Sequence, residues 1–169
     1  VMNWLVVEKN NVAEAHHTAG VKARDDAEKI LIDAGCKELA IEISDDRYTA
    51  GKLDKLLIHF KLLKEWNKTF SPVKKGDVVF IQFPVINHTL VFDIAIKKLI
   101  KNDVKVVALI HDLEVLRLLL FDGAPIMRKW RLKREEVSVM KLFSEIIVHN
   151  ESMLEYMNQA FGIPKEKMI

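Results

Sequence analysis

The sequence predicts a doubly wound α/β domain with a Rossmann-like parallel sheet, on the basis of two observations. Short apolar runs alternate with longer amphipathic stretches along the whole chain. The runs at 78–83 and 104–110 are continuously apolar, which is typical of strands that are buried on both faces of a parallel sheet. Strands that alternate with helices in this way are joined by right-handed βαβ crossovers.

The first half of the chain predicts three strands and two helices. Strands are expected at 4–7, 39–43 and 78–83, and helices at about 23–34 and 53–66. Apolar residues recur at helical spacing in both helices, and Gly35 ends the first one. Pro84 ends the third strand because proline has no N–H to donate to a neighbouring strand.

The second half continues the alternation. Strands are expected at 104–110 and 146–149, and helices at about 89–101, 113–121, 135–143 and 151–161. Asp112 is placed to cap the helix that follows it. Met168 and Ile169 indicate the opening of a further strand, so we expect the chain to be one domain, residues 1–169, of a longer protein.

Composition narrows the class of protein. A chain of 169 residues, 50% hydrophobic and 30% charged, suits one globular domain. Its net charge of +2 gives no general attraction to nucleic acid. A single cysteine, Cys36, excludes an internal disulfide and a cysteine-based zinc site. We therefore expect a cytoplasmic protein, and no apolar stretch has the length of a signal peptide or a membrane span.

Polar residues follow nearly every expected strand. They are Glu8 to Asn11, Ser44 and Asp45, Gln82, His111 and Asp112, and His149 and Asn150. Ligands of open parallel sheets bind at the carboxyl ends of the strands. Each residue alone fits a cap or a turn, but together they predict a polar cleft for a hydroxyl-rich ligand.

His111 and Asp112 are the sharpest pair at this edge. Either side chain could take a proton from a sugar hydroxyl. In the alternative interpretation, Asp112 is a helix cap and His111 is a buried polar residue bonded to backbone. Both interpretations stay open, because a cap can also be a site residue.

The loop before the first helix favours an anion but predicts no metal. Gly20 allows close backbone approach, and a helix N-terminus attracts phosphate. The chain has no G-x-G-x-x-G, so a nicotinamide or flavin dinucleotide is not expected. Adjacent side chains diverge, so His16 and His17 do not predict a metal site.

Residues 128–134 are the strongest charge cluster, and we interpret them as a basic loop around Trp130. Such a loop lies next to the apolar group 118–121 in the sequence and could dock on the anionic inner face of a membrane. In the favoured alternative, residues 128–134 are a solvated connecting segment and the leucines of 118–121 belong to the core. No nucleic-acid-binding motif accompanies it. If exposed, residues 118–121 could form a homo-oligomer interface.

Four stretches carry a resemblance to a known family. They are Thr18–Leu31, Gly76–Pro84, Val106–Arg117 and Ile147–Met153, in this order along nearly the whole chain. Together they resemble the N-terminal domain of bacterial galactofuranosyltransferase-type enzymes and of related glucosyltransferases that glycosylate serine-rich adhesins. The His-Asp pair is the most specific of the matching elements.

The resemblance implies one half of a GT-B glycosyltransferase. In such enzymes two Rossmann-like domains face each other, and the N-terminal one receives the acceptor. No cofactor or metal is implied; the substrates are a nucleotide sugar, with UDP the favoured nucleotide, and a glycan, glycolipid or glycoprotein acceptor. Asp112 would bind or deprotonate the acceptor hydroxyl beside His111. The residues implied in substrate binding are Gln82, Asn150, Arg117, Asn11, His16 and Thr18.

Two other functions are weighed against this one. A non-catalytic flavodoxin-like binding or receiver module needs an acidic cluster after the first strand, where this chain has Glu8-Lys9-Asn10. A serine hydrolase of the same sheet class needs G-x-S-x-G, which is absent.

Overall fold

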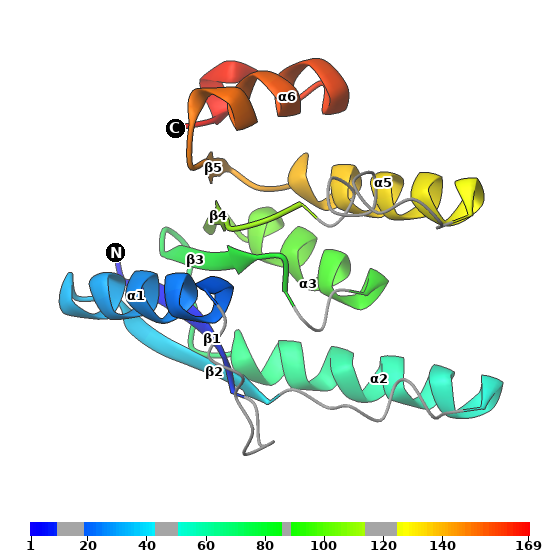
Figure 1. Ribbon diagram of the computed structural model, residues 1–169. Coiled ribbons are helices and arrows are strands. Elements are labelled where there is room, and N and C mark those ends of the chain that lie inside the picture. The colour runs from blue at the N-terminus through cyan, green and yellow to red at the C-terminus, as the bar shows by residue number, and fades with distance from the viewer. Residues whose placement is uncertain (10–18, 43–50, 86–88, 114–124) are drawn as a thin grey trace.

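The chain folds into a parallel sheet flanked by helices, in a computed structural model that describes residues 1–9, 19–42, 51–85, 89–113 and 125–169 (Figure 1). The elements are β1 (Asn3–Lys9), α1 (Ala19–Asp33), β2 (Lys37–Glu42), α2 (Lys52–Thr69), β3 (Val78–Phe83), α3 (Leu90–Lys101), β4 (Lys105–Ile110), α5 (Ile126–Met140), β5 (Glu145–Ile147) and α6 (Glu151–Phe161).

The five strands of the sheet lie in the order β2-β1-β3-β4-β5, and all are parallel. The predicted doubly wound α/β fold is therefore confirmed. This strand order is the flavodoxin-like one, whose topological switch point lies between β1 and β3. β3 and β4 pair over their full lengths, from Val78 opposite Lys105 to Phe83 opposite Ile110. Both strands thus end side by side at the carboxyl edge.

The residues of β1 alternate between two apolar layers. Leu5 and Val7 pack with Cys36, with Leu31 of α1 and with Phe80 of β3. Figure 1 shows α1 lying across this face of the sheet. Because side chains alternate along a strand, the neighbouring residues of β1 face the opposite layer, where the larger core lies.

That larger core is built around Trp66 of α2, which is fully buried. Its ring stacks on Phe70 with centroids 5.5 Å apart and meets Phe92 of α3 at 5.0 Å. Ile81 and Phe83 of β3 are fully buried in the same cluster. This packing fixes α2 and α3 against the sheet and so fixes the ends of the central strands.

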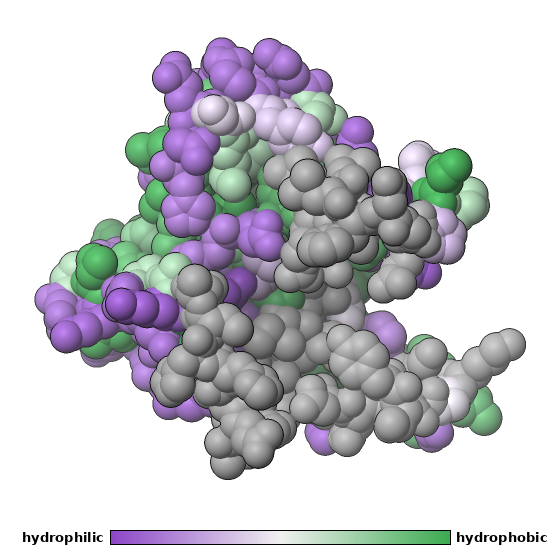
Figure 2. All heavy atoms as spheres, viewed as in Figure 1, coloured by the Kyte–Doolittle hydropathy of each residue, from purple (hydrophilic) through white to green (hydrophobic). Residues whose placement is uncertain are grey.

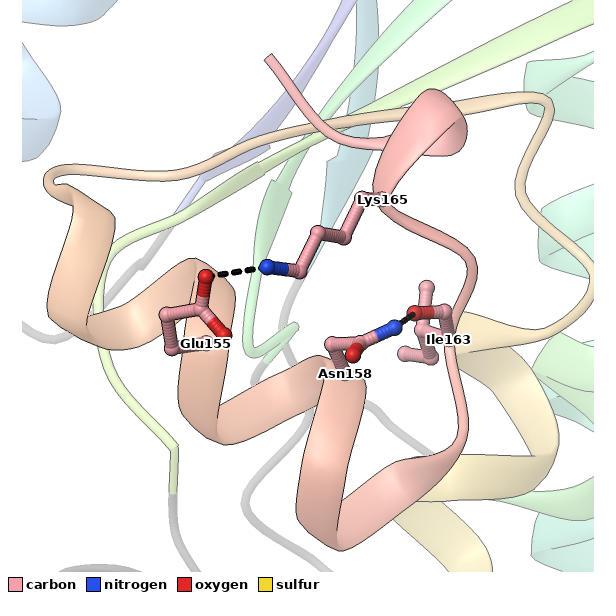
Figure 3. Close-up of polar contacts among 4 residues, drawn as sticks. All are labelled: Glu155, Asn158, Ile163 and Lys165. Carbon is pink, nitrogen blue, oxygen red and sulfur yellow. Dashed lines mark hydrogen bonds and ion pairs between the residues drawn. The ribbon is translucent and has the colours of Figure 1, made fainter.

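The chain after α6 returns to the edge of the sheet (Figure 3). Gly162 ends α6 in the left-handed region at φ 66°, and Asn158 donates from Nδ2 to the carbonyl of Ile163 over 2.8 Å. Lys165 forms an ion pair with Glu155. Met168 then pairs in parallel with Ile146 of β5. This single bridge lies where the opening of a further strand was expected, at 168–169.

One prediction about the helices was wrong. Residues 128–134 are not a loop but lie within α5, which begins after Pro125. The segment contains no glycine or proline, and its Arg, Lys and Leu residues are strong helix formers. In α2, the apolar residues of the first turns do not pack on the core. Leu53, Leu56, Leu57 and Phe60 are exposed, because this half of α2 projects past the end of the sheet (Figure 1).

Other boundaries moved by a few residues. β1 extends through Glu8 and Lys9, and β5 ends at Ile147, before His149. The helix expected at 113–121 and the polar residues Ser44 and Asp45 lie outside the described residues.

Candidate functional site

The carboxyl ends of β3 and β4 hold a buried polar contact. Nε2 of His111 lies 2.6 Å from Oε1 of Gln82. Gln82 is only 7% exposed, so its amide oxygen requires a partner and finds it in the imidazole. Because β3 and β4 are in register, Gln82 lies opposite Leu109, two residues before His111. The backbone N–H of His111 also donates to the carbonyl of Phe83.

His111 is held in its neutral form. Burial lowers the pKa of its imidazole to about 4, and the nearby charges of Arg24 and His149 act in the same direction. Its Nδ1 is buried and has no hydrogen-bond partner among the described residues. With Oε1 of Gln82 as the acceptor, the single proton of the ring lies on Nε2. At neutral pH this side chain is a weak base, and both of its nitrogens are turned away from solvent or already bonded.

Arg24 belongs to the candidate site by position, and sequence reasoning missed it. It lies in α1, and its Nη2 donates to the carbonyl of Pro84 over 2.5 Å. Burial lowers the pKa of the guanidinium, while the charges of Glu8 and Asp112 oppose this shift. The cation therefore sits at the switch point, between the end of β1 and the ends of β3 and β4. Its place in the first turns of the helix that follows β1 is the sequence feature that could have identified it.

Asp112 presents an exposed carboxylate beside this cation. Its Oδ1 accepts from the backbone N–H of Leu113 over 2.7 Å. This bond comes from the next residue, and the helix that Asp112 was expected to cap lies outside the described residues. The side chain of Asp112 is exposed, so a ligand can reach the carboxylate from solvent.

The two residues after β5 differ in position and partners. The ring of His149 lies 5.7 Å from that of His111, so it borders the same cluster. Asn150 caps α6, and its Oδ1 accepts from the N–H of Met153 over 2.9 Å. The structure thus brings together Arg24, Gln82, His111, Asp112 and His149, which we call the strand-end cluster.

The remaining residues that the resemblance implied in substrate binding lie in other parts of the chain. Asn11, His16, Thr18 and Arg117 lie outside the described residues. Within the described ranges, no group of three or more His, Cys, Asp or Glu side chains could hold a metal ion.

A cavity of about 600 Å³ lies at the opposite edge of the sheet, between the C-terminal ends of α2 and α3. Its lining includes Lys75, Lys98 and Asp103. Since Asp103 precedes β4, this cavity is at the amino ends of the strands, where ligands of such sheets do not usually bind. Its size therefore does not make it the better candidate than the strand-end cluster.

Among the residues that the structure describes, no helix combines the length and apolar character needed to cross a membrane.

Comparison with known proteins gives one positive finding. No curated protein matches the chain. Residues 5–169 match the family described as glucosyltransferase 3-like, N-terminal domain. The match covers all five strands and the whole strand-end cluster, apart from the first two residues of β1. The chain therefore belongs to the family of glucosyltransferase 3-like N-terminal domains.

Proposed function

We propose that this domain is the acceptor side of a two-domain GT-B enzyme that transfers a hexosyl group, glucosyl or galactofuranosyl, from a nucleotide sugar. The acceptor is a hydroxyl of a glycan, glycolipid or glycoprotein. One observation carries the proposal: an exposed carboxylate, Asp112, ends a central strand beside the guanidinium of Arg24 in a chain of glucosyltransferase-like family.

Asp112 is the general base in this proposal. It takes the proton of the acceptor hydroxyl while the hydroxyl oxygen forms its bond to the anomeric carbon of the donor. The bond between that carbon and the nucleoside diphosphate breaks, and its electron pair leaves with the phosphate. The donor, with UDP as its nucleotide, is held by the second domain, and the reaction uses no bound metal or organic cofactor.

His111 orients rather than reacts. Because its pKa is about 4, it stays neutral at working pH and is a poor proton acceptor. Its contact with Gln82 fixes the ring at the end of β4, next to Asp112 in the chain. Arg24 compensates the negative charge of Asp112 and Glu8. The resulting surface offers donors and acceptors with little net charge, which suits a neutral polyol.

A receiver-like binding module is the second candidate, since flavodoxin-like proteins share the strand order β2-β1-β3-β4-β5. Strand order alone does not assign function. Incubation with acetyl phosphate and magnesium separates the two candidates, because a receiver forms a stable aspartyl phosphate and the proposed transferase does not.

The test of transfer uses the full-length protein. It is incubated with a panel of nucleotide sugars and a mixture of glycan acceptors, and free nucleotide is measured. Release with one donor, together with glycosylated acceptor, supports the proposal. Formation of an aspartyl phosphate in the parallel incubation, with no nucleotide release, contradicts it.

A further inference from the structure

The first two turns of α5 expose large apolar side chains. Ile126 is 84% exposed, Met127 is 75% exposed and Trp130 is 58% exposed. Met127 and Trp130 also line an open hollow of about 470 Å³ with Pro125 and Arg131. The apolar surface of an exposed tryptophan is stabilised when it leaves water, so this helix end is suited to an apolar or interfacial contact.

Cations flank these apolar groups. The guanidinium of Arg134 lies 5.6 Å from the centre of the Trp130 ring. Arg131 faces Glu135 at 3.7 Å, and both side chains of this pair are well exposed. The stretch 128–134 carries five basic residues and no acidic one. We call Ile126, Met127, Trp130, Arg131 and Arg134 the basic-apolar end of α5.

The neighbouring helix ends continue the apolar surface. Leu53, Leu56, Leu57 and Phe60 of α2 and Leu90 and Ile94 of α3 are all exposed. Residues of α2, α3 and α5 line one small shared hollow, to which His59, Leu90 and Glu135 contribute. In Figure 1 the N-terminal ends of α2 and α5 project in the same direction, and Figure 2 shows hydrophobic side chains at both projecting ends.

We propose that the basic-apolar end of α5 docks this domain on an anionic phospholipid surface. Helices that lie in a membrane interface combine Lys and Arg with exposed Trp and aliphatic side chains at low overall hydrophobicity. The cations contact the anionic headgroups, and Trp130, Met127 and Ile126 enter the boundary with the acyl chains. Docking of this kind needs no spanning helix.

Charge decides between this occupant and a second copy of the chain. A two-fold interface would set the same surface against itself, so the exposed Arg131 and Arg134 of one copy would lie against the same basic surface of the other. Such like-charge contacts oppose association. An anionic surface instead attracts both arginines.

The test measures binding of the full-length protein to vesicles by sedimentation. We expect binding to vesicles that contain phosphatidylglycerol, none to phosphatidylcholine alone, and loss of binding as salt rises. Each basic residue near an anionic surface contributes several-fold, so Arg131→Glu with Arg134→Glu should weaken binding by about 30-fold or more. Trp130→Ala with Met127→Ala should weaken it by at least about tenfold through lost apolar contact.

Matched controls lie on α1. Lys22→Glu with Lys29→Glu changes the net charge equally, and Ile30→Ala removes an aliphatic side chain that is 67% exposed. Both controls should bind as the wild type does. Tryptophan emission should shift to the blue on binding, and the shift should be lost in Trp130→Phe.

Three results would overturn the proposal. They are equal binding to neutral vesicles, unchanged binding of the charge-reversed variant, and a lipid-free oligomer that Trp130→Ala dissociates. The last result would assign the surface to a second copy. None of them bears on sugar transfer, because the variants leave the strand-end cluster intact.

Discussion

His111 and Gln82 are joined across the ends of the two central strands, with Nε2 of the imidazole 2.6 Å from Oε1 of the amide. The contact combines the register of β3 and β4 with the burial of Gln82. His111 lies two residues beyond Leu109, the residue that pairs with Gln82, and this contact fixes its ring at the edge of the sheet. The position of Asp112, the next residue, is fixed with it.

Replacing Gln82 with glutamate should raise the pKa of His111 from its value of about 4. A carboxylate at the amide's position would stabilise the imidazolium by direct charge-assisted hydrogen bonding. Nuclear magnetic resonance titration of isotope-labelled histidine measures the shift. Gln159→Glu, at an exposed position of α6, should leave the His111 titration unchanged. An unshifted His111 in Gln82→Glu would show that the two side chains do not meet in solution.

Arg24→Met should also raise the pKa of His111. The guanidinium is a nearby positive charge that disfavours protonation of the ring, and methionine keeps much of the apolar stem without the charge. The same titration detects the change. Lys22→Met removes a charge from an exposed position of the same helix and should have no comparable effect. Equal shifts in both variants would mean that Arg24 has no special place beside His111.

Asp77 should make stability depend on pH in the acid range. Its carboxylate accepts from Met2 N, Trp4 Nε1 and Lys74 N, and these bonds, with that from Lys74 the strongest, lower its pKa from 3.8 to about 2. A depressed folded-state pKa stabilises the fold above the unfolded value, and this stability is lost as pH falls from about 4 toward about 2.

Denaturant unfolding across that window measures the effect. Asp77→Asn should lower the midpoint at neutral pH and flatten the dependence between about pH 4 and pH 2, because the amide cannot accept from all three donors. Asp26→Asn, at an exposed position of α1, should keep the wild-type slope. The same slope in Asp77→Asn would exclude this carboxylate as its source.

Trp66 should contribute to stability through its ring and not through its N–H. It is fully buried against Phe70 and Phe92, and its Nε1 has no hydrogen-bond partner among the described residues. Trp66→Ala should therefore lower the free energy of unfolding by about 3–5 kcal/mol. Trp66→Phe keeps an aromatic contact and releases an unpaired buried donor, so its loss should be less than half as large. Equal losses in the two variants would contradict this division.

The elements that the sequence predicted best are those with chemical boundaries at both ends. The strand 78–83 lies between the turn at Gly76 and Pro84, and the helix 151–161 lies between Asn150 and Gly162; both match the structure residue for residue. Residues 128–134 lie after Pro125, but no glycine or proline marks the C-terminal end of their helix. Their charge suggested a loop, although exposed helices carry the same composition.

The grouping of residues at the candidate site was predicted in part, for a topological reason. Polar residues at strand ends meet at one edge in any parallel sheet, so Gln82, His111 and His149 could be grouped from sequence. Their hydrogen bonds could not, because these depend on register. Arg24 was not predicted because it lies in a helix and its contact is with Pro84, 60 positions away in the sequence. Asn150 was expected to bind substrate, which stays a prediction; the structure shows that its side-chain oxygen caps α6.

The measurement closest to the central claim compares Asp112→Asn with Asp103→Asn in the full-length protein, with the donor that supports nucleotide release. Asp103 lies at the opposite edge of the sheet with φ 56°, a conformation that asparagine also accepts. Loss of a general base should lower kcat by about 10²- to 10⁴-fold in Asp112→Asn, while Asp103→Asn retains the wild-type rate. Wild-type turnover in Asp112→Asn would remove this carboxylate from the reaction and contradict the proposed function of the strand-end cluster.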